Sequence, residues 1–307
     1  MVDTKSKIPG FDSSLPLFVS PAAMAKLIHP DGELALARAS QAKGVIQCIT
    51  LNASYPLQQI IQTTTETGGD PCQPFFFQLY VNRDRTKSEA ILSQCERISN
   101  IKAIFVTVDA AAAGKREADE RVKLTDEDYL GDGATQAMIE SESSGNTNTA
   151  KSKKSDAKGA GLTRIMGSYI DPGLCWDDIS WLRKHTSLPL VLKGIMAADD
   201  AILAAQHDID GLVLSNHGGR NLDTSPPSIL VLLELRRRCP EIFSKVKIFI
   251  DGGIRRGTDV LKALCLGATA VGLGRPFLYA LTYGQEGVEA LVDCELSPQL
   301  HIKKPLD

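Results

Sequence analysis

Short apolar runs recur along the chain and alternate with longer stretches in which apolar and polar residues are mixed. The apolar runs have the length of buried β-strands, and the mixed stretches have the spacing of amphipathic helices. Strands are predicted at 17–20, 45–50, 75–80, 104–108, 188–192, 211–214, 246–250 and 270–273. Helices are predicted at 33–42, 57–65, 88–98, 176–184, 198–205, 228–239 and 257–266.

This strict alternation predicts an α/β fold. A helix between two consecutive strands returns the chain to the same edge of the sheet, so the strands run parallel. Eight such units match a closed (β/α)8 TIM barrel, whose active site lies at the carboxyl ends of the strands. An open doubly wound sheet is the alternative. It normally has fewer units and a dinucleotide-type glycine turn after the first strand, and the sequence lacks that turn.

One interval interrupts the alternation. About 80 residues separate the fourth predicted strand from the fifth, whereas neighbouring intervals are about 20 to 35 residues long. Residues 140–161 are rich in Ser, Asn, Thr, Gly, Ala and Lys, a composition that cannot bury enough apolar surface to offset the entropy lost on ordering. We therefore expect a flexible, low-complexity loop at about 131–161, within a single domain that spans 1–307.

Composition and charge narrow the classes of function. A hydrophobic content of 43% is ordinary for a globular protein, and a net charge of -3 gives no electrostatic footprint for nucleic acid. The seven cysteines form no Cys-x-x-Cys pair, which favours reduced thiols and no metal site. No apolar run approaches the roughly 18 residues of a membrane helix, and residues 1–9 lack the apolar core of a signal peptide. We expect a soluble protein without membrane association, with the cytoplasm as the favoured location.

Polar side chains follow four neighbouring strands at the point where each predicted strand ends. They are Gln78 and Tyr80 after the third strand, Thr107 and Asp109 after the fourth, Lys193 after the fifth, and His217 and Arg220 after the sixth. Each alone has an ordinary structural explanation, such as a turn cap or a half-buried core aromatic. The carboxyl ends of barrel strands meet at one mouth, so the whole set is expected to lie together there.

The segment His217-Gly218-Gly219-Arg220 carries the most specific chemistry. Histidine can take up a proton near neutral pH, and the planar guanidinium of arginine can hold a carboxylate through two parallel hydrogen bonds. The two glycines between them permit backbone conformations that let both side chains face one pocket. Taken alone, the segment could be an ordinary glycine turn with an exposed histidine. Beside the other polar residues it predicts chemistry on a small organic anion.

Two glycine-rich turns, at 251–257 and 272–276, follow the seventh and eighth strands, and each contains arginine. Such turns expose backbone N–H groups at the start of a helix, where the helix dipole favours a phosphate. Barrels commonly hold phosphate after these two strands. The turns therefore predict a cofactor that carries a phosphate group.

Together these motifs resemble the FMN-dependent α-hydroxy acid oxidases and dehydrogenases. This family includes glycolate oxidase and the flavin domain of flavocytochrome b2, an L-lactate dehydrogenase. The resemblance runs from about residue 17 to about residue 292 and includes the segments 21–24, 29–33, 78–80, 107–109, 114–117, 192–194, 215–223 and 251–281. The low-complexity loop also resembles the corresponding loop of the flavocytochrome branch.

The resemblance implies that FMN is the cofactor. Its phosphate would be held by Gly252, Gly253, Arg255, Gly274 and Arg275, in turns that also include Asp251 and Ile254. Its ring would contact Pro21, Ala22, Ala23, Thr50, Gln78 and Thr107. Lys193 would lie at the N1 and O2 edge of the flavin, where its positive charge would stabilise the reduced, anionic ring.

The resemblance also implies oxidation of an L-2-hydroxy acid, lactate-like or glycolate-like, to the 2-oxo acid. His217 would act as general base, with Asp109 orienting its imidazole. Arg220 and Arg116 would bind the substrate carboxylate, and Tyr80 would hydrogen-bond the substrate oxygen. The electron acceptor stays open among oxygen, a cytochrome and a quinone. A homotetramer is the assembly that the resemblance suggests.

The chain departs from the family pattern at its ends. Members carry a further segment before the first barrel strand and a long last helix, so we expect abbreviated ends, a short eighth helix and a thin final seam. A truncated, catalytically weak FMN-binding remnant is therefore a second hypothesis. A third is another phosphate-binding barrel, such as an isomerase or a nucleotide dehydrogenase.

Overall fold

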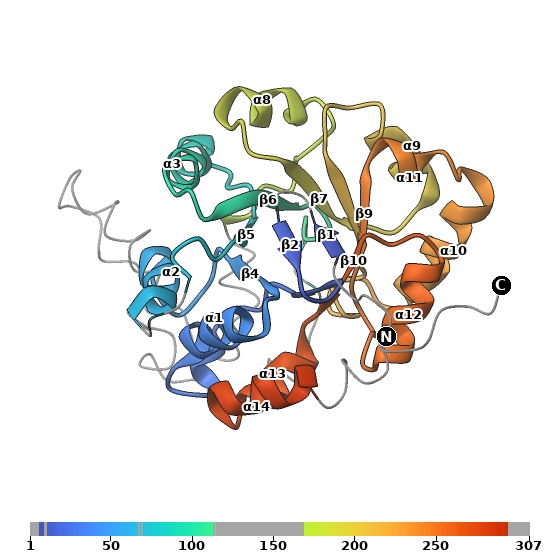
Figure 1. Ribbon diagram of the computed structural model, residues 1–307. Helices are drawn as coiled ribbons and strands as arrows, with labels where there is room; N and C mark the ends of the chain where they lie inside the picture. Colours follow the sequence, from blue (N-terminus) through green and yellow to red (C-terminus); the bar gives the residue numbers. More distant parts are fainter. Residues whose placement is uncertain are drawn as a thin grey trace, which may run out of the picture.

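A closed ring of eight parallel strands forms the centre of the molecule (Figure 1). The computed structural model describes residues 6–8, 11–66, 68, 70–112, 114 and 169–293, so the loop predicted at 131–161 lies outside the described residues. The strands pair in the order β10-β3-β4-β5-β6-β7-β8-β9. They are β3 (Leu17–Val19), β4 (Ile46–Thr50), β5 (Phe75–Leu79), β6 (Ile101–Thr107), β7 (Leu190–Ile195), β8 (Gly211–Leu214), β9 (Lys247–Ile250) and β10 (Ala270–Leu273). The predicted (β/α)8 barrel is confirmed, and an open sheet is excluded because the ring leaves no edge.

Helices surround the ring (Figure 1). They are η1 (Ala25–Leu27), α1 (Gly32–Lys43), α2 (Leu57–Glu66), α3 (Arg85–Glu96), α8 (Asp178–His185), α9 (Ala198–Ala204), α10 (Ser228–Arg238), α11 (Ile242–Lys245), α12 (Gly257–Cys265), α13 (Arg275–Leu281) and α14 (Gly284–Leu291). The predicted strands and helices are all present, with boundaries displaced by at most three residues. Within the part of the chain that the structure describes, no helix has the length and apolar character that a bilayer crossing requires.

The seam between the last and first barrel strands is paired and covered. Three registered pairs join β10 to β3, beginning with Val271 opposite Leu17. A short eighth helix without stated bounds was expected after the last strand. Two helices, α13 and α14, follow β10, and α14 packs against both α13 and α1 (Figure 1). Residues 294–307, on which part of the expectation of an abbreviated end rested, lie outside the described residues.

Strand alternation decides which side chains reach the barrel interior. Successive side chains along a strand point to opposite faces. In β5, Phe77 packs outward beneath the helices, whereas Phe76 packs inside the barrel. There it stacks on Phe105 with ring centroids 4.7 Å apart. The same alternation continues from Phe76 to Gln78 and Tyr80, which line the cavity described below. The inward-facing residues of this one strand segment therefore contribute to the barrel core at one end and to the cavity at the other.

A β-hairpin covers the end of the barrel at which the strands begin. The sequence analysis did not predict this hairpin. Its strands β1 (Ser6–Ile8) and β2 (Phe11–Ser13) pair antiparallel and lie across the middle of the ring (Figure 1). Ile8 is buried in the interior cluster beside Phe18 and Phe76. Strands of three residues are too short to show a hydrophobic period, which explains why the sequence pattern missed them.

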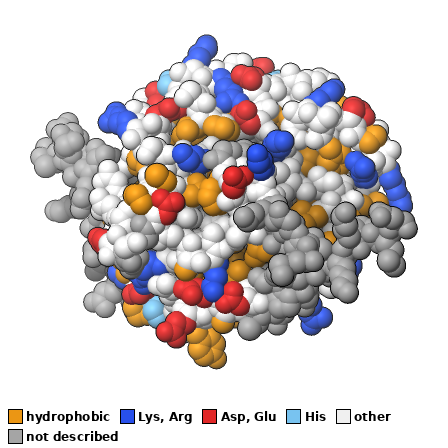
Figure 2. Space-filling view, in the orientation of Figure 1, with side chains coloured by type: hydrophobic (Ala, Val, Ile, Leu, Met, Phe, Trp, Pro, Cys, Tyr) orange, Lys and Arg blue, Asp and Glu red, His pale blue; other side chains and the backbone are white. Residues whose placement is uncertain are grey.

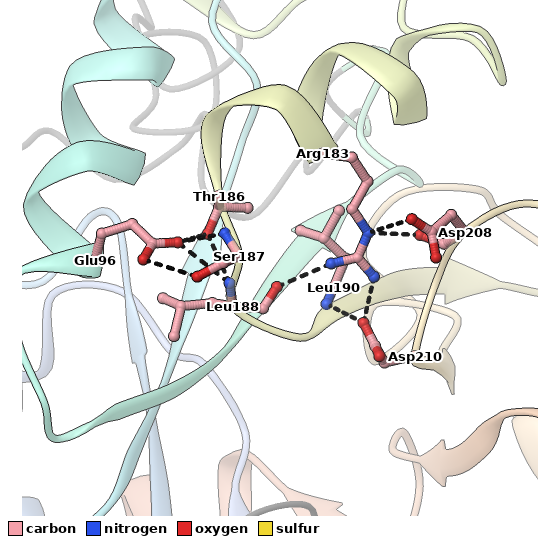
Figure 3. A network of polar contacts seen from close by, with 8 residues as sticks. All are labelled: Glu96, Arg183, Thr186, Ser187, Leu188, Leu190, Asp208 and Asp210. Carbon is pink, nitrogen blue, oxygen red and sulfur yellow. Dashed lines mark hydrogen bonds and ion pairs between the residues drawn. The ribbon is translucent and has the colours of Figure 1, made fainter.

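Hydrogen bonds and ion pairs hold the loops that precede the barrel strands β7 and β8 (Figure 3). Arg183 of α8 donates to the backbone carbonyls of Asp208 at 2.7 Å and Leu188 at 3.1 Å, and it pairs with the carboxylate of Asp210. Asp210 also accepts a hydrogen bond from the N–H of Leu190, at 2.8 Å, where β7 begins. These bonds join α8, β7 and the turn before β8.

Glu96, at the end of α3, makes a second set of contacts beside the first (Figure 3). It accepts hydrogen bonds from the hydroxyl of Thr186 at 2.6 Å and from the N–H groups of Ser187 and Leu188. Glu96 is exposed, and the hydrogen bond from Thr186 lowers its pKa. In the orientation of Figure 1, positive and negative side chains are interspersed over the surface (Figure 2). The carboxylate of Glu96 and the groups around it thus satisfy one another.

Candidate active site

A cavity of about 720 Å³ opens at the carboxyl ends of the barrel strands. Its volume lies within the roughly 300–1,000 Å³ of typical small-molecule sites. The predicted site residues that line it are Pro21, Ala22, Ala23, Thr50, Gln78, Tyr80, Thr107, Lys193, His217, Arg220, Asp251, Gly252, Gly253, Ile254, Arg255, Gly274 and Arg275. Asp109 is not in the lining but contacts His217 from behind. Arg116 lies outside the described residues.

His217, directly after β8, links Asp109 and Tyr80. Its Nδ1 lies 2.9 Å from Asp109 Oδ1, and its Nε2 lies 3.4 Å from the hydroxyl of Tyr80. Because Asp109 engages Nδ1, the other ring nitrogen is left to exchange a proton within the cavity. The backbone of His217 has a φ of 56°, a left-handed conformation that costs a non-glycine residue about 1–3 kcal/mol and often occurs at functional sites.

The loop that carries His217 is fastened on two sides. The side-chain amide of Asn221 donates to the backbone carbonyl of Asp109 at 2.7 Å, which joins the loops after β6 and β8. The guanidinium of Arg275 donates to the backbone carbonyl of Gly218 at 2.8 Å, which joins the loop after β8 to the start of α13. Arg220 lines the same cavity. These bonds orient the loop toward the barrel mouth.

Lys193, in β7, places a buried positive charge at the floor of the cavity. It is 5% exposed, and its Nζ donates to Ser215 Oγ at 3.1 Å and lies 3.7 Å from Asp251 Oδ2. Burial alone would lower the pKa of Lys193, but the carboxylates of Asp251 and Asp109 outweigh burial and raise it. Lys193 therefore stays protonated, and its charge faces whatever the cavity binds.

Thr50, Gln78 and Thr107 form a hydrogen-bonded row across three adjacent strands. Thr50 Oγ1 donates to Gln78 Oε1 at 2.8 Å, and Gln78 Nε2 donates to Thr107 Oγ1 at 3.0 Å. All three side chains are buried from bulk solvent and line the cavity. The row fixes the orientation of each polar group, which suits recognition of a flat, polar ring edge.

The glycine turns form the opposite wall. Gly252 and Gly253 have φ values of 86° and 81°, which side chains other than glycine rarely adopt. A Cβ on Gly252 would also lie 2.6 Å from Asn216 Oδ1, so the turn has no space for one. Arg255 follows in the same turn and lines the cavity, as does Arg275 at the start of α13. The wall combines backbone N–H groups with two guanidinium groups, a set of donors suited to a phosphate.

The structure adds cavity residues that the sequence analysis did not select. They are Ser20, Gly218, Gly272, Pro276, Leu278 and Tyr279. Ser20 Oγ donates to Asp251 Oδ2 at 3.2 Å and so belongs to the Lys193 network. Its place at the end of the first predicted strand was a usable signal, whereas apolar Leu278 on a helix offered none.

The fold and the site define a class of protein. It is a (β/α)8 barrel with a phosphate-type anion wall, a buried lysine and a His–Asp pair around one cavity at the carboxyl ends of its strands. Among the described residues, no group of three or more His, Cys, Asp or Glu side chains could hold a metal ion.

Comparison with known proteins identifies the family. A family model described as FMN-dependent dehydrogenase matches residues 1–300. L-lactate dehydrogenase (cytochrome) of Wickerhamomyces anomalus is 40% identical over 291 residues, covering 94% of this chain and 46% of that protein. Glycolate oxidase of Spinacia oleracea is 37% identical over 292 residues, covering 95% and 73%. A solved structure of mandelate oxidase with (S)-4-hydroxymandelic acid matches with a TM-score of 0.80 at 34% identity, covering 97% and 78%.

The chain belongs to the family of FMN-dependent α-hydroxy acid dehydrogenases and oxidases. The alternative of an unrelated phosphate-binding barrel is thereby excluded. The chain spans less than half the length of the L-lactate dehydrogenase (cytochrome) that it matches and about three quarters of the glycolate oxidase.

The residues present fit FMN, the cofactor of this family. The cavity is large enough for a drug-sized ligand, and the glycine turns leave their backbone open at one wall. At its floor, the buried ammonium of Lys193 and the row of Thr50, Gln78 and Thr107 supply polar groups for the edge of a flat ring. The wall of glycine turns and arginines suits the phosphate of a flavin mononucleotide, and the polar floor suits the polar edge of its ring.

Proposed function

We propose that this chain catalyses the FMN-dependent oxidation of an L-2-hydroxy acid to the corresponding 2-oxo acid. The observation that carries the proposal is the shared cavity. His217 and Arg220 line the same space as Lys193 and the glycine turns. A proton acceptor, a carboxylate-binding cation and a cofactor wall therefore surround one volume. Family membership supports the same reaction class.

In this proposal, the residues of the anion wall hold the FMN phosphate. They are Gly252, Gly253, Arg255, Gly274 and Arg275, with Asp251 and Ile254 in the same turn. The residues that contact the ring are Pro21, Ala22, Ala23, Thr50, Gln78 and Thr107. When bound, FMN supplies the acceptor for the two electrons that leave the substrate α-carbon.

His217 serves as the general base, since it lines the cavity while Asp109 engages its Nδ1 and leaves Nε2 available. It accepts a proton of the substrate H–C–OH group as the 2-oxo product forms. Asp109 orients the imidazole and stabilises the imidazolium. Tyr80, 3.4 Å from Nε2, donates a hydrogen bond to the substrate oxygen.

Substrate is held by its carboxylate. Arg220 is positioned three residues after His217 and forms the clamp, with Arg116 as a second cation. Lys193 contributes positive charge where negative charge accumulates during the reaction, which favours electron transfer. The names of the relatives, an L-lactate dehydrogenase and a glycolate oxidase, support a lactate-like or glycolate-like substrate. Oxygen, a cytochrome or a quinone as electron acceptor, and a tetrameric assembly, stay predictions.

Anaerobic mixing of the FMN-loaded protein with L-lactate and glycolate tests the proposal. Bleaching of the flavin absorbance is expected for the wild-type chain. Replacement His217→Gln should slow this bleaching by at least about a hundredfold, the scale of general-base catalysis. His207→Gln is the matched control, since His207 stacks on Trp176, with ring centroids 5.0 Å apart, and does not line the cavity. Unchanged bleaching in His217→Gln would refute the assigned role, and a wild-type protein that binds no FMN would refute the function.

A further inference from the structure

Glu33 is a buried carboxylate that the proposed reaction does not use. Among the described residues, the buried charged side chains are Glu33, Lys193 and Asp251. Lys193 and Asp251 line the cavity, whereas Glu33 does not. Glu33 is 1% exposed and belongs to the first turn of α1. A charged group is rarely buried without partners, so its contacts indicate its role.

Glu33 joins the two loops that form one side of the cavity. Its Oε1 accepts a hydrogen bond from the N–H of Ala25 at 3.0 Å and another from the N–H of Ser54 at 3.0 Å. Ala25 lies two residues after the segment 21–23, which lines the cavity beyond β3, and Ser54 lies four residues after Thr50, which lines it at the end of β4. One carboxylate oxygen thus connects two cavity walls.

Further bonds join the same two loops directly. The N–H of Met24 donates to the carbonyl of Asn52 at 3.3 Å, and the N–H of Lys26 donates to Ser54 Oγ at 3.1 Å. Met24 has a φ of 58°, a left-handed conformation that is unfavourable for its side chain. The loop after β3 is therefore strained at Met24, and the bond from Ala25 to Glu33 holds it immediately after this strained residue.

The start of α1 is shaped to bring Glu33 close to these loops. Gly32 precedes it with a φ of 42°, and a Cβ at this position would lie 2.8 Å from the backbone nitrogen of Lys26. Only glycine permits this approach. A carboxylate in the first turn of a helix is also favoured by the helix dipole, and charge-assisted hydrogen bonds are stronger than neutral ones. Burial raises the pKa of Glu33, and the N–H groups of Ser54 and Ala25 partly oppose this rise.

We infer that Glu33 is a positioning residue for the cofactor: it fastens the loops at 21–27 and 50–54 to each other and so holds Ala22, Ala23 and Thr50 in place against the FMN ring. This inference rests on the proposed function and deepens it. Glu33 acts only through the loops, since it does not line the cavity.

Glu96 provides a matched control for Glu33. It also accepts hydrogen bonds from two backbone N–H groups, those of Ser187 and Leu188, but it does so at the other end of the barrel (Figure 3). Truncation of either carboxylate removes bonds of the same kind. Only truncation of Glu33 should disturb the cavity walls, so the pair separates positioning of the cofactor from a general loss of stability.

The experiment compares Glu33→Ala, Glu33→Gln and Glu96→Ala as FMN-loaded proteins. FMN released on dilution is measured by its fluorescence, and the absorption spectrum of the bound flavin is recorded in parallel. We expect Glu33→Ala to bind FMN about tenfold more weakly, because displaced walls cost affinity, and its flavin spectrum to shift toward that of free FMN. Glu33→Gln keeps an oxygen acceptor and should restore both readouts to within about threefold of wild type. Glu96→Ala should lower the melting temperature and leave both readouts unchanged.

Wild-type FMN affinity and spectrum in Glu33→Ala would overturn the inference, as would equal weakening in Glu96→Ala. If Glu33→Ala does not fold, Glu33→Asp takes its place, since its shorter side chain cannot reach both N–H groups and should weaken FMN binding. Wild-type affinity in Glu33→Asp would likewise overturn the inference. Wild-type protein bleached by a 2-hydroxy acid supports the proposed function in either case, so the two conclusions fail separately.

Discussion

At each end of the barrel a glutamate accepts hydrogen bonds from backbone N–H groups, but one glutamate is buried and the other is exposed. Glu33 at the cavity end and Glu96 at the other end each accept hydrogen bonds from two backbone N–H groups of neighbouring loops. Glu33 is buried and its pKa is raised by burial, whereas Glu96 is exposed and its pKa is lowered by the hydrogen bond from Thr186. Burial, and not the number of hydrogen bonds, decides the sign of the shift.

The difference extends to the polar groups around each carboxylate. At the cavity end, the second carboxylate oxygen of Glu33 is buried without a hydrogen-bond partner among the described residues, and so are Asp109 Oδ2, Asn216 Oδ1 and Ser228 Oγ. At the other end, Arg183, Asp210 and the neighbouring backbone groups satisfy one another (Figure 3). Polar atoms without a partner therefore lie close to the cavity, whereas the groups around Arg183 hold the chain.

The largest expected effect is a loss of activity on substitution at the cavity end. Asp109→Asn keeps the shape of the side chain but removes the charge that stabilises protonated His217. The rate of flavin bleaching by a 2-hydroxy acid should fall by about a hundredfold. The melting temperature should stay close to that of wild type, because a neutral amide still occupies the site. A bleaching rate near that of wild type would mean that Asp109 does not assist His217.

An intermediate effect is expected for a substitution at the opposite end, which should lower stability without changing FMN affinity. Asp210→Ala removes the acceptor of the Leu190 N–H and the partner of Arg183. An unpaired N–H at the start of β7 should lower the free energy of unfolding by about 1–3 kcal/mol. Chemical denaturation measures this loss. FMN affinity should not change, and a weakened affinity would contradict the separation of the two ends.

The smallest expected effect is a pH dependence at Glu96. Its pKa is lowered from the ordinary value of 4.5, so its ionised form stabilises the folded chain above that pH, and this contribution is lost as pH falls through the lowered pKa. The stability difference between wild type and Glu96→Gln should be at most about 1 kcal/mol near neutral pH, because solvent screens an exposed group. It should shrink as the pH falls below 4.5 in parallel denaturation curves. A difference that grows on acidification would contradict the sign of the shift.

The sequence pattern was sufficient to predict the ring of strands. Local apolar runs located every barrel strand to within three residues. Polar residues near the carboxyl ends of the predicted strands, such as Gln78, Lys193 and His217, were predicted to lie at the barrel mouth, and all three line the cavity. Glycine turns with arginine located the anion wall in the same way.

Features that depend on distant contacts were not visible in the pattern. The hairpin β1–β2 gains its stability from Ile8 inside the barrel, and its two short strands have no period of their own. The role of Glu33 arises from Ala25 and Ser54, which are 8 and 21 residues away along the chain. No local rule selects one glutamate on α1 as the partner of two loops.

By itself, the sequence determined the repeating strand–helix order, the closed barrel and the kinds of chemical group at its mouth, because these follow from local periodicity and from residue type. Only the tertiary structure decided the 2.9 Å contact of Asp109 with His217, the burial of Glu33 and the fastening of the opposite end by Arg183 and Glu96. Distances and burial depend on how separate segments pack, and packing is a property of the whole chain.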